Sequence, residues 1–318
     1  MSTRTYTPVA AAPAGSTVGN TGSIGPVLVA DDGRHLAASW TEPPAGNAHA
    51  VAVVSSAAGV PRGYYRAFAQ WLAERGYAVL TYDYRGIAGS RAPGPLRHER
   101  GSMRDWAVLD MSAALAAAEA RRGGRGLPLL LVGHSFGGNA IGFARGVERA
   151  DALLTVASQQ GEVRLYPGVH RLIAGTFFRV WLPAVTALFG HAPGWSVGPG
   201  AQALPRAVAR QWSGWGLRRD WAYGDPLMRP FSSFGAIVAP VHVWGISDDL
   251  TYAPPRAVDA LAARYRNAAV QRHTLAPADV GQRRLGHFGV FRREPGALAW
   301  QRLLAPIEAA VPALQPPR

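Results

Sequence analysis

The stretch LPLLLVGHSFGGNAIGF, residues 127–143, carries the clearest fold signal in the chain. An apolar run leads into Ser135, which has glycines two positions before and after it, Gly133 and Gly137, and a helix is predicted from about Gly138. Gly-x-Ser-x-Gly at a strand-to-helix turn is typical of a nucleophile elbow, in which the serine adopts a strained backbone conformation. Side chains at both glycine positions would collide with such a turn, so we expect Ser135 to project above a sheet.

Apolar runs alternate with helical patterns on both sides of this stretch. The predicted strands lie in residues 26–40 (two strands around an Asp-Gly turn), 50–56, 77–84, 127–132, 152–158, 238–245 and 268–275. The other predicted helices cover residues 64–75, 105–122, 255–264 and 296–310. This alternation predicts an α/β fold with about eight strands in a mostly parallel sheet, helices on both faces and an antiparallel edge from the first hairpin.

One long segment, residues 159–235, breaks the alternation. It carries five tryptophans with several prolines and glycines, and it is too long and too aromatic for a plain loop. We expect a helical cap, inserted into a core domain made of residues 25–158 and 236–312. Residues 1–24 are rich in Pro, Gly, Ser and Thr, which predicts a flexible tail.

The composition narrows the classes of function. The chain has 318 residues, a net charge of +13 and no cysteine, which excludes disulfides, thiolate metal sites and a cysteine nucleophile. All 33 basic residues are arginine, scattered in pairs without interleaved aromatics, so we attribute them to compositional bias and expect no nucleic-acid partner. No His-x-x-x-His pattern or acidic cluster is present, so we expect neither metal nor cofactor.

The longest apolar stretch, residues 172–189, nearly has the length of a membrane span. It contains Arg179 and Pro183, and we therefore expect it to belong to a soluble domain rather than to cross a membrane. The N-terminus lacks the charged start and continuous apolar core of a secretory signal, so a cytoplasmic location is expected. The oligomeric state is not predicted.

Two further stretches add an acid and a histidine in the chain order Ser, Asp, His. In WGISDDLTYAPP, residues 244–255, two acids follow the end of a strand; we choose Asp248 to orient a histidine and keep Asp249 as the alternative, since one of them can instead cap the next helix. In RRLGHFGVF, residues 283–291, His287 lies in a loop after the last strand, where it would serve as general base and acid. His134 is expected to be a packing residue under the nucleophile.

The loops after the third and fourth predicted strands have different expected roles. In VVSSAAGVPRGYY, residues 53–65, small side chains would let a backbone amide approach a substrate carbonyl, so Ala57 and Phe136 N–H are the expected oxyanion donors. A simple tight turn is the alternative reading of this loop. In DYRGIAGS, residues 83–90, we expect a structural role, with Arg85 holding the loop in place.

These motifs together resemble the α/β-hydrolase superfamily over roughly residues 26–310. GHSFG matches the elbow, DYRGIAGS the Asp-x-Arg-Gly loop, and GISDD and GHF the acid and histidine loops. The chain is most similar to serine aminopeptidase S33-type, lysophospholipase-like hydrolases, especially a bacterial branch in which residues 155–171 and 203–216 mark the cap. Many of these relatives carry His-Gly where this chain has Ser55-Ser56. The resemblance implies hydrolysis of an ester, thioester or amide through an acyl-enzyme intermediate.

The resulting hypothesis is a serine hydrolase that acts on a small-molecule ester or thioester of a hydrophobic acyl group. Apolar cap residues are expected either to line the pocket or to form the cap's own core: Phe177, Phe178, Trp181, Leu182 and Leu188. An aminopeptidase or a cofactor-free perhydrolase with the same triad is the alternative, although the cap holds few acids to bind a substrate amine: Glu162, Asp220 and Asp225. A non-catalytic protein that binds an apolar ligand is the alternative from another class.

Overall fold

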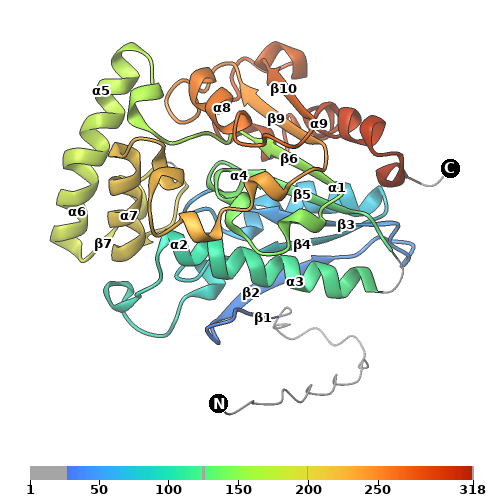
Figure 1. Ribbon diagram of the computed structural model, residues 1–318, viewed down its shortest axis with the longest axis horizontal. Helices are drawn as coiled ribbons and strands as arrows, with labels where there is room; N and C mark the ends of the chain where they lie inside the picture. The colour runs from blue at the N-terminus through green and yellow to red at the C-terminus, as the bar shows by residue number, and fades with distance from the viewer. Residues whose placement is uncertain (1–26, 124–125, 199, 317–318) are drawn as a thin grey trace.

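Eight strands form one sheet in the order β1-β2-β4-β3-β5-β6-β9-β10 (Figure 1). The computed structural model describes residues 27–123, 126–198 and 200–316, so the predicted tail at 1–24 lies outside it. The strands are β1 (Val27–Val29), β2 (His35–Thr41), β3 (Ala50–Ser55), β4 (Tyr77–Tyr82), β5 (Leu129–His134), β6 (Ala152–Val156), β9 (Val241–Ile246) and β10 (Val270–Leu275). β2 pairs antiparallel with β1 and β4, and every other neighbouring pair is parallel. The predicted sheet is confirmed.

The central strands are continuous apolar runs because both faces of the sheet are covered. All residues of β3, β4, β5, β6 and β9 are buried, as expected for parallel strands between helical layers. In this parallel arrangement the carboxyl ends of β3, β5, β6 and β9 meet at one edge of the sheet. Ligand sites of α/β sheets lie at that edge.

Helices cover both faces of the sheet and form the cap. They are α1 (Arg66–Glu74), α2 (Met103–Asp105), α3 (Met111–Arg122), α4 (Phe136–Asn139), α5 (Gly168–Thr176), α6 (Leu182–Phe189), α7 (Arg206–Leu217), α8 (Pro255–Ala262) and α9 (Gly296–Ala310). α1 and α9 pack together, with the Phe68 and Trp300 rings 5.6 Å apart. α3 and α8 lie in front of the sheet in the view of Figure 1, on the opposite side from α1.

The helix after the elbow, which the sequence predicted to start at about Gly138, starts at Phe136 and is only 4 residues long. α4 ends at Asn139, and only a 3-10 turn, Ile141–Phe143, follows it. Tertiary contacts take the place of helical hydrogen bonds here: Ser233 N–H donates to Gly142 O at 2.7 Å, and Tyr223 Oη donates to Asn139 O at 2.7 Å. The glycines in this segment are poor helix formers, so these competing bonds prevail.

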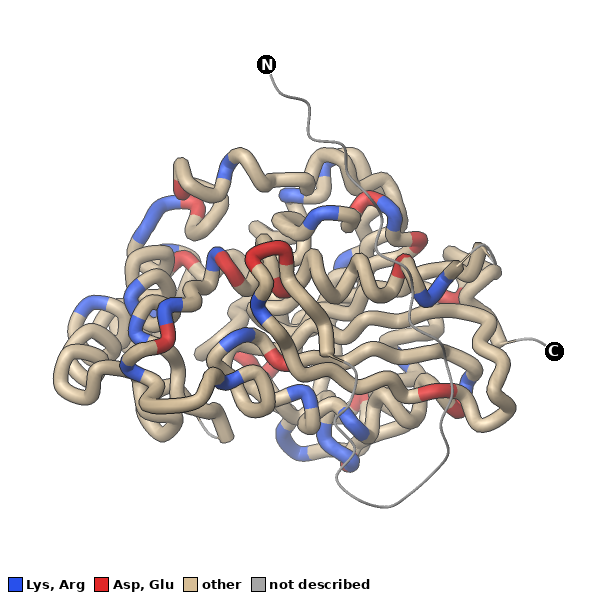
Figure 2. Tube along the Cα trace, turned by 90° about the horizontal axis from the view of Figure 1, so that it is seen from below, with Lys and Arg blue, Asp and Glu red and all other residues tan. Residues whose placement is uncertain are grey.

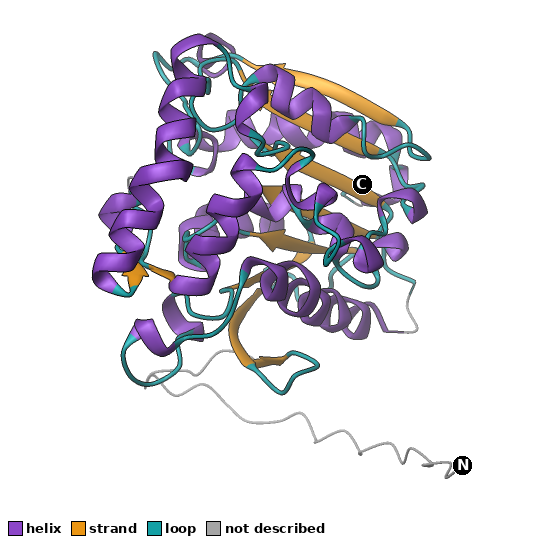
Figure 3. Ribbon diagram, turned by 60° about the vertical axis from the view of Figure 1, so that its left-hand side comes forward, coloured by secondary structure: helices purple, strands orange, loops and turns teal. Residues whose placement is uncertain are grey.

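The inserted segment between β6 and β9 contains α5, α6, α7 and a two-stranded ribbon of β7 (His191–Ala192) and β8 (Leu204–Pro205). A π-helical segment, Phe177–Trp181, joins α5 to α6, so one helix runs continuously from Gly168 to Phe189. Figure 3 shows this long helix along the outer side of the molecule, with the sheet on its inner side. The cap therefore stands beside the carboxyl edge of the sheet.

Arg85 holds the loop after β4, as the sequence predicted. Its backbone and guanidinium N–H groups donate to Asp110 at 2.9 and 2.7 Å, and the guanidinium also pairs with Asp32 at 2.5 Å. Burial raises the pKa of Asp110 to about 6, although Arg85 opposes this shift. One buried arginine thus ties the β4 loop to the segment before α3 and to the β1–β2 turn.

Removing Arg85 should destabilise the fold strongly. Arg85→Met leaves the Asp110 carboxylate buried without its partner, and we expect the free energy of unfolding to fall by about 3 to 5 kcal/mol. Arg121→Met is the matched control because Arg121 pairs with Glu42 at the surface, where loss of an ion pair costs about 0 to 1 kcal/mol. Urea unfolding at neutral pH compares the two, and equal losses would contradict this role of Arg85.

Candidate active site

Ser135 occupies the strained turn between β5 and α4. Its backbone φ of +52° and ψ of −119° are rare for a residue with a side chain. A β-carbon at Gly137 would lie 2.1 Å from Ser55 O, and one at Gly133 would lie 2.4 Å from the Gly138 Cα. The structure confirms that both glycines make room for the turn, and Ser135 lines the cavity above the sheet.

The acid that contacts His287 is Asp249, not Asp248. His287 Nδ1 and Asp249 Oδ2 are 2.5 Å apart, and both side chains are buried. Burial raises the pKa of Asp249, but the charge and hydrogen bond of His287, together with backbone N–H groups including that of Tyr252, leave this pKa below its ordinary value. The choice of Asp248 is therefore wrong, and Asp249, the alternative named from the sequence, is the acid that contacts His287.

Asp248 anchors the loop that carries His287. Its carboxylate accepts the backbone N–H groups of Leu285 at 3.0 Å and Gly286 at 2.9 Å. Gly286 has a φ of +56°, a conformation that glycine adopts without strain. The two neighbouring acids therefore have different partners: one binds the imidazole and the other binds the backbone just before it.

The backbone amides near Ser135 differ from the expected oxyanion pair. Phe136 N–H has no hydrogen-bond partner among the described residues, and Phe136 lines the cavity, as expected of a free donor. Ala57 N–H, however, donates to Tyr65 Oη at 2.9 Å, so the structure does not leave it free. The next residue, Ala58, also lines the cavity, and its amide makes no hydrogen bond within the described part of the chain.

The sequence analysis missed a buried hydrogen-bond network next to Ser135. Tyr65 Oη lies 2.7 Å from His134 Nδ1, and His134 Nε2 lies 3.0 Å from His287 O. Burial lowers the pKa of His134 to about 3, so the ring is neutral and accepts from Tyr65 while donating to His287. His134 is fully buried next to Ser135, as predicted for a packing residue, and it also links the β3, β5 and histidine loops.

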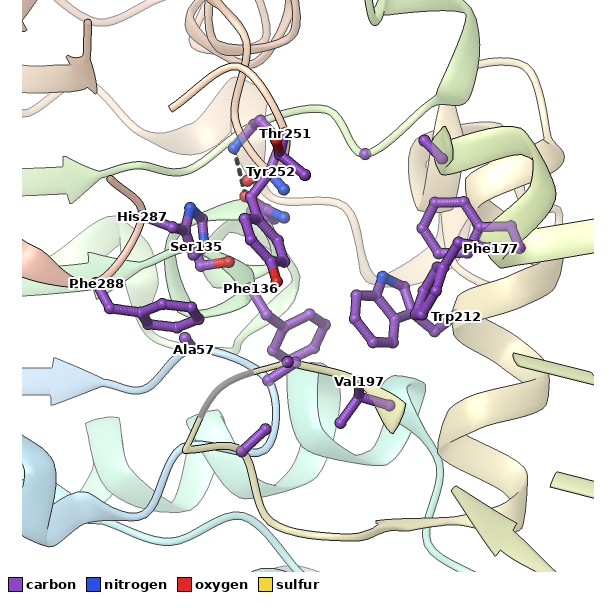
Figure 4. Close-up of a pocket in the computed structure, with 18 of the residues that line it drawn as sticks. Ala57, Ser135, Phe136, Phe177, Val197, Trp212, Thr251, Tyr252, His287 and Phe288 are labelled. Atoms are coloured by element: carbon purple, nitrogen blue, oxygen red, sulfur yellow. Dashed lines mark hydrogen bonds between the residues drawn. The ribbon is translucent and has the colours of Figure 1, made fainter. Parts of the chain in front are cut away.

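A cavity of about 310 Å³ lies between the sheet edge and the cap. Figure 4 shows Ser135 and His287 at one end and Phe177 and Trp212 at the other. Among the described residues, the cavity wall contains no Asp, Glu or Arg, and nine Phe, Tyr and Trp side chains contribute to it. The cavity can therefore hold an apolar group next to a serine and a histidine.

Two of the five cap residues named from the sequence line this cavity. Phe177 and Phe178 do so, whereas Trp181 and Leu182 do not. Trp181 turns outward and donates from Nε1 to Ser196 O at 3.0 Å, and Leu182 is fully buried in the cap's own core. Leu188 is also outside the cavity, with 77% of its surface exposed. Residues 195–198 and Tyr252, which the sequence analysis did not predict as pocket residues, also line the cavity.

The His287 imidazole is held on several sides. The Tyr252 ring stacks on it at 4.8 Å, and the Phe288 ring meets it edge-on at the same distance. The Ser135 hydroxyl makes no hydrogen bond with any described residue; catalytic hydrogen bonds often form only when substrate is bound. Within the described ranges, no group of three or more His, Asp or Glu side chains is arranged to hold a metal ion.

Acid should destabilise the fold through His134. This residue has a pKa of 6.5 when exposed and about 3 in the folded chain, so between these values the unfolded chain binds the additional proton. The free energy of unfolding should fall as the pH drops below 6.5, by up to about 1.4 kcal/mol per pH unit from this group. Urea unfolding of wild type and His134→Gln from about pH 7.5 to about pH 5 measures this slope.

The difference between the two proteins isolates His134, because His242, whose pKa burial lowers to about 4, contributes equally to both. A variant with the same pH slope as wild type would show that His134 does not carry the effect.

Comparisons with known proteins agree with this architecture. Residues 46–185 match the family model described as serine aminopeptidase, S33. Similar structures include Est1E of Butyrivibrio proteoclasticus with ferulic acid bound (16% identity, TM-score 0.56, covering 90% of this chain and 99% of that one). A putative aryl esterase of Burkholderia cenocepacia (17%, 0.54, 90% and 98%) and an esterase of Exiguobacterium antarcticum (13%, 0.53, 89% and 99%) are also similar. No curated protein sequence matches significantly.

At these identities the structural likeness concerns the fold, and the family pattern in residues 46–185 adds the sequence evidence. The pattern spans β3, the elbow and the first part of the cap, including Ser135. Together with the sheet order and the strained serine turn, this match makes the chain similar in fold to the α/β-hydrolases and, over residues 46–185, similar in sequence pattern to the S33 serine aminopeptidases.

Proposed function

We propose that the protein is a serine hydrolase that cleaves an ester or thioester of a hydrophobic or aromatic acyl group through an acyl-enzyme intermediate. The observation that carries the proposal is that the elbow serine and His287, which is paired with Asp249, both line one largely apolar cavity. A binding protein would need neither the strained turn nor a buried acid–imidazole pair. Both features cost folding free energy that a ligand-binding site alone does not require.

The proposed reaction uses the groups in the order of a Ser-His-Asp triad. Ser135 Oγ attacks the acyl carbon while His287 Nε2 takes the serine proton, and Asp249 stabilises the resulting imidazolium through Nδ1. The tetrahedral intermediate then collapses, and the C–O bond to the alcohol breaks as His287 returns the proton to it. Water attacks the acyl-enzyme with His287 again as the base, which releases the carboxylic acid and restores Ser135.

Two amides are the proposed donors for the oxyanion. Phe136 N–H keeps the role predicted from the sequence, and Ala58 N–H replaces that of Ala57, which is bonded to Tyr65. Such donors contribute mainly in the transition state, when the carbonyl oxygen carries negative charge. The proposal for these two amides is supported by the fact that neither N–H group donates a hydrogen bond to any described residue and that both residues line the cavity.

The acidic residues of the cap argue against an aminopeptidase. A peptidase of this kind needs a carboxylate to bind the substrate ammonium group, yet none of the three cap acids lines the cavity. Glu162 accepts from Arg164 at 2.7 Å, Asp220 pairs with Arg264 at 2.8 Å, and Asp225 accepts from Trp215 Nε1 at 2.7 Å. With these carboxylates engaged elsewhere, a neutral ester fits the cavity better than a charged peptide terminus.

Substitution of the two adjacent acids tests the triad. Ser135→Ala and Asp249→Asn should each lower kcat for p-nitrophenyl esters by about 10³-fold or more, the latter because the imidazole loses its orientation and charge partner. Asp248→Asn is the matched control: it keeps an oxygen acceptor for the loop amides, so about tenfold loss or less is expected. A fluorophosphonate probe should label the wild type but not Ser135→Ala.

Equal losses in Asp248→Asn and Asp249→Asn, with both variants folded, would refute the assignment of Asp249. Absence of both labelling and turnover in the wild type would refute the hydrolase mechanism itself.

The choice between ester and amide needs a separate measurement. Because no carboxylate lines the cavity, kcat/KM for phenylacetyl or medium-chain acyl esters should exceed that for aminoacyl amides by about 100-fold or more. The assay compares both substrate classes with the same chromogenic leaving group where possible. Faster cleavage of the aminoacyl amides would favour the aminopeptidase alternative.

A further inference from the structure

Exposed apolar side chains concentrate on one helix of the cap. Among the described residues, seven of the fourteen large hydrophobic side chains that are exposed lie between Gly168 and Phe189. They are Val169, Leu172, Ile173, Val180, Trp181, Leu188 and Phe189. A soluble monomer rarely leaves such a contiguous set uncovered, and one of this size marks an interaction surface.

The exposed residues follow the helical repeat. Positions 169, 172, 173, 176, 180, 183, 184, 187 and 188 are all exposed, and they carry apolar residues apart from one threonine. This outer apolar face, defined by these nine positions, has the spacing that an amphipathic helix normally turns toward a core. The opposite side of the helix is apolar as well, so the helix has two apolar faces and only one of them is packed.

The helix is long and apolar enough to cross a membrane by length and composition, but its inner side is bound to the cap. Ser213 Oγ of α7 donates to Phe178 O at 2.5 Å, and the Phe178 ring packs at 5.7 Å against that of Trp212. Gly216 gives the Phe178 ring room, since a β-carbon there would lie 2.5 Å from it. Spanning a bilayer would break these contacts, whereas lying on one would keep them.

The charge of the cap indicates which surface it fits. From Val163 to Arg219 the chain has seven arginines and no aspartate or glutamate. The outermost helical turns of the cap, at the left of Figure 2, accordingly show arginine and no acidic residue. Arg171 and Arg179 lie within the long helix itself, and both are exposed. Apolar side chains flanked by arginines match the acyl boundary and the phosphate groups of an anionic lipid surface.

We propose that the outer apolar face docks the protein on anionic lipid surfaces, with the long helix lying in the plane of the interface. The leucine, valine and isoleucine side chains enter the acyl boundary, and Arg171 and Arg179 contact lipid phosphates. A second copy of the chain would be a poorer occupant, because two such faces would bring arginines together without any facing acid.

The cavity reaches the same face. Ile173 and Trp195 line the cavity and are exposed by 49% and 66%, so the cavity wall continues into the apolar surface. If the proposed function holds, an apolar ester can pass from the lipid to Ser135 along this wall. Docking itself does not depend on the proposed function and is tested without turnover.

Vesicle cosedimentation tests the docking. The full chain is mixed with vesicles of equal parts phosphatidylglycerol and phosphatidylcholine, or of phosphatidylcholine alone. We expect binding that is at least about tenfold tighter to the anionic vesicles, and a loss of at least about tenfold in the variant Leu172→Gln/Leu188→Gln. Neither leucine lines the cavity, so hydrolysis of a soluble short-chain ester should not change.

The control is Leu227→Gln/Val238→Gln, which removes two apolar side chains of similar exposure, 67% and 68%, away from the long helix. This variant should bind like wild type, and circular dichroism should show that both variants fold. Loss of the anionic preference in Arg171→Gln/Arg179→Gln would add support.

Three results would overturn the proposal. The first is no vesicle binding by wild type. The second is vesicle binding that the leucine substitutions leave unchanged, which would assign it to other arginines. The third is a concentration-dependent dimer in lipid-free solution that these substitutions abolish, since it would show that a second copy covers the face.

Discussion

The contact between Gly137 and the end of β3 constrains the whole site. The turn after β5 passes so close to Ser55 O that no side chain fits at Gly137, and next to this approach Ser135 adopts its strained, positive-φ conformation. The strain is sustained because β3 and β5 are paired, fully buried neighbours at the centre of the sheet. The rigidity of the core therefore fixes the direction of one hydroxyl group.

Around that turn the loops are connected by hydrogen bonds rather than by packing alone. His134 joins Tyr65, which follows the β3 loop, to the backbone of His287, and Tyr64 Oη donates to Phe288 O at 2.5 Å. A buried polar network of this kind is stable only when its members are paired, and here the neutral imidazole serves as both acceptor and donor. The fold thus positions the loops around Ser135 and His287 through one another as well as through the sheet.

The sequence predicted the parts of the molecule that depend on local pattern. The order of strands and helices follows from periodicity, and the elbow glycines follow from steric limits. The role of Arg85 in holding the loop after β4 follows from its charge. Each of these signals acts over a few residues. The choice between Asp248 and Asp249 depends on which carboxylate faces a histidine 38 positions away, a distance in sequence over which spacing carries no information.

The other errors have the same origin. The Ala57 amide is engaged because Tyr65 reaches it, and α4 is short because the cap supplies competing hydrogen bonds from Tyr223 and Ser233. Trp181 was predicted to line the cavity because a helix with two apolar faces does not show in its sequence which face points inward. In the structure its indole turns outward and donates to Ser196 O. Tertiary contacts decide each case.

The neighbouring pair Asp248 and Asp249 has a mechanical consequence. The Asp249 carboxylate binds the imidazole of His287, and the Asp248 carboxylate accepts hydrogen bonds from the backbone just before it. Both the side chain and the backbone of the histidine loop are therefore bound to the same short segment after β9. A displacement of that segment carries both groups together and preserves their separation. In the proposed mechanism, the distance that such a displacement would change is the one from the imidazole to the Ser135 hydroxyl.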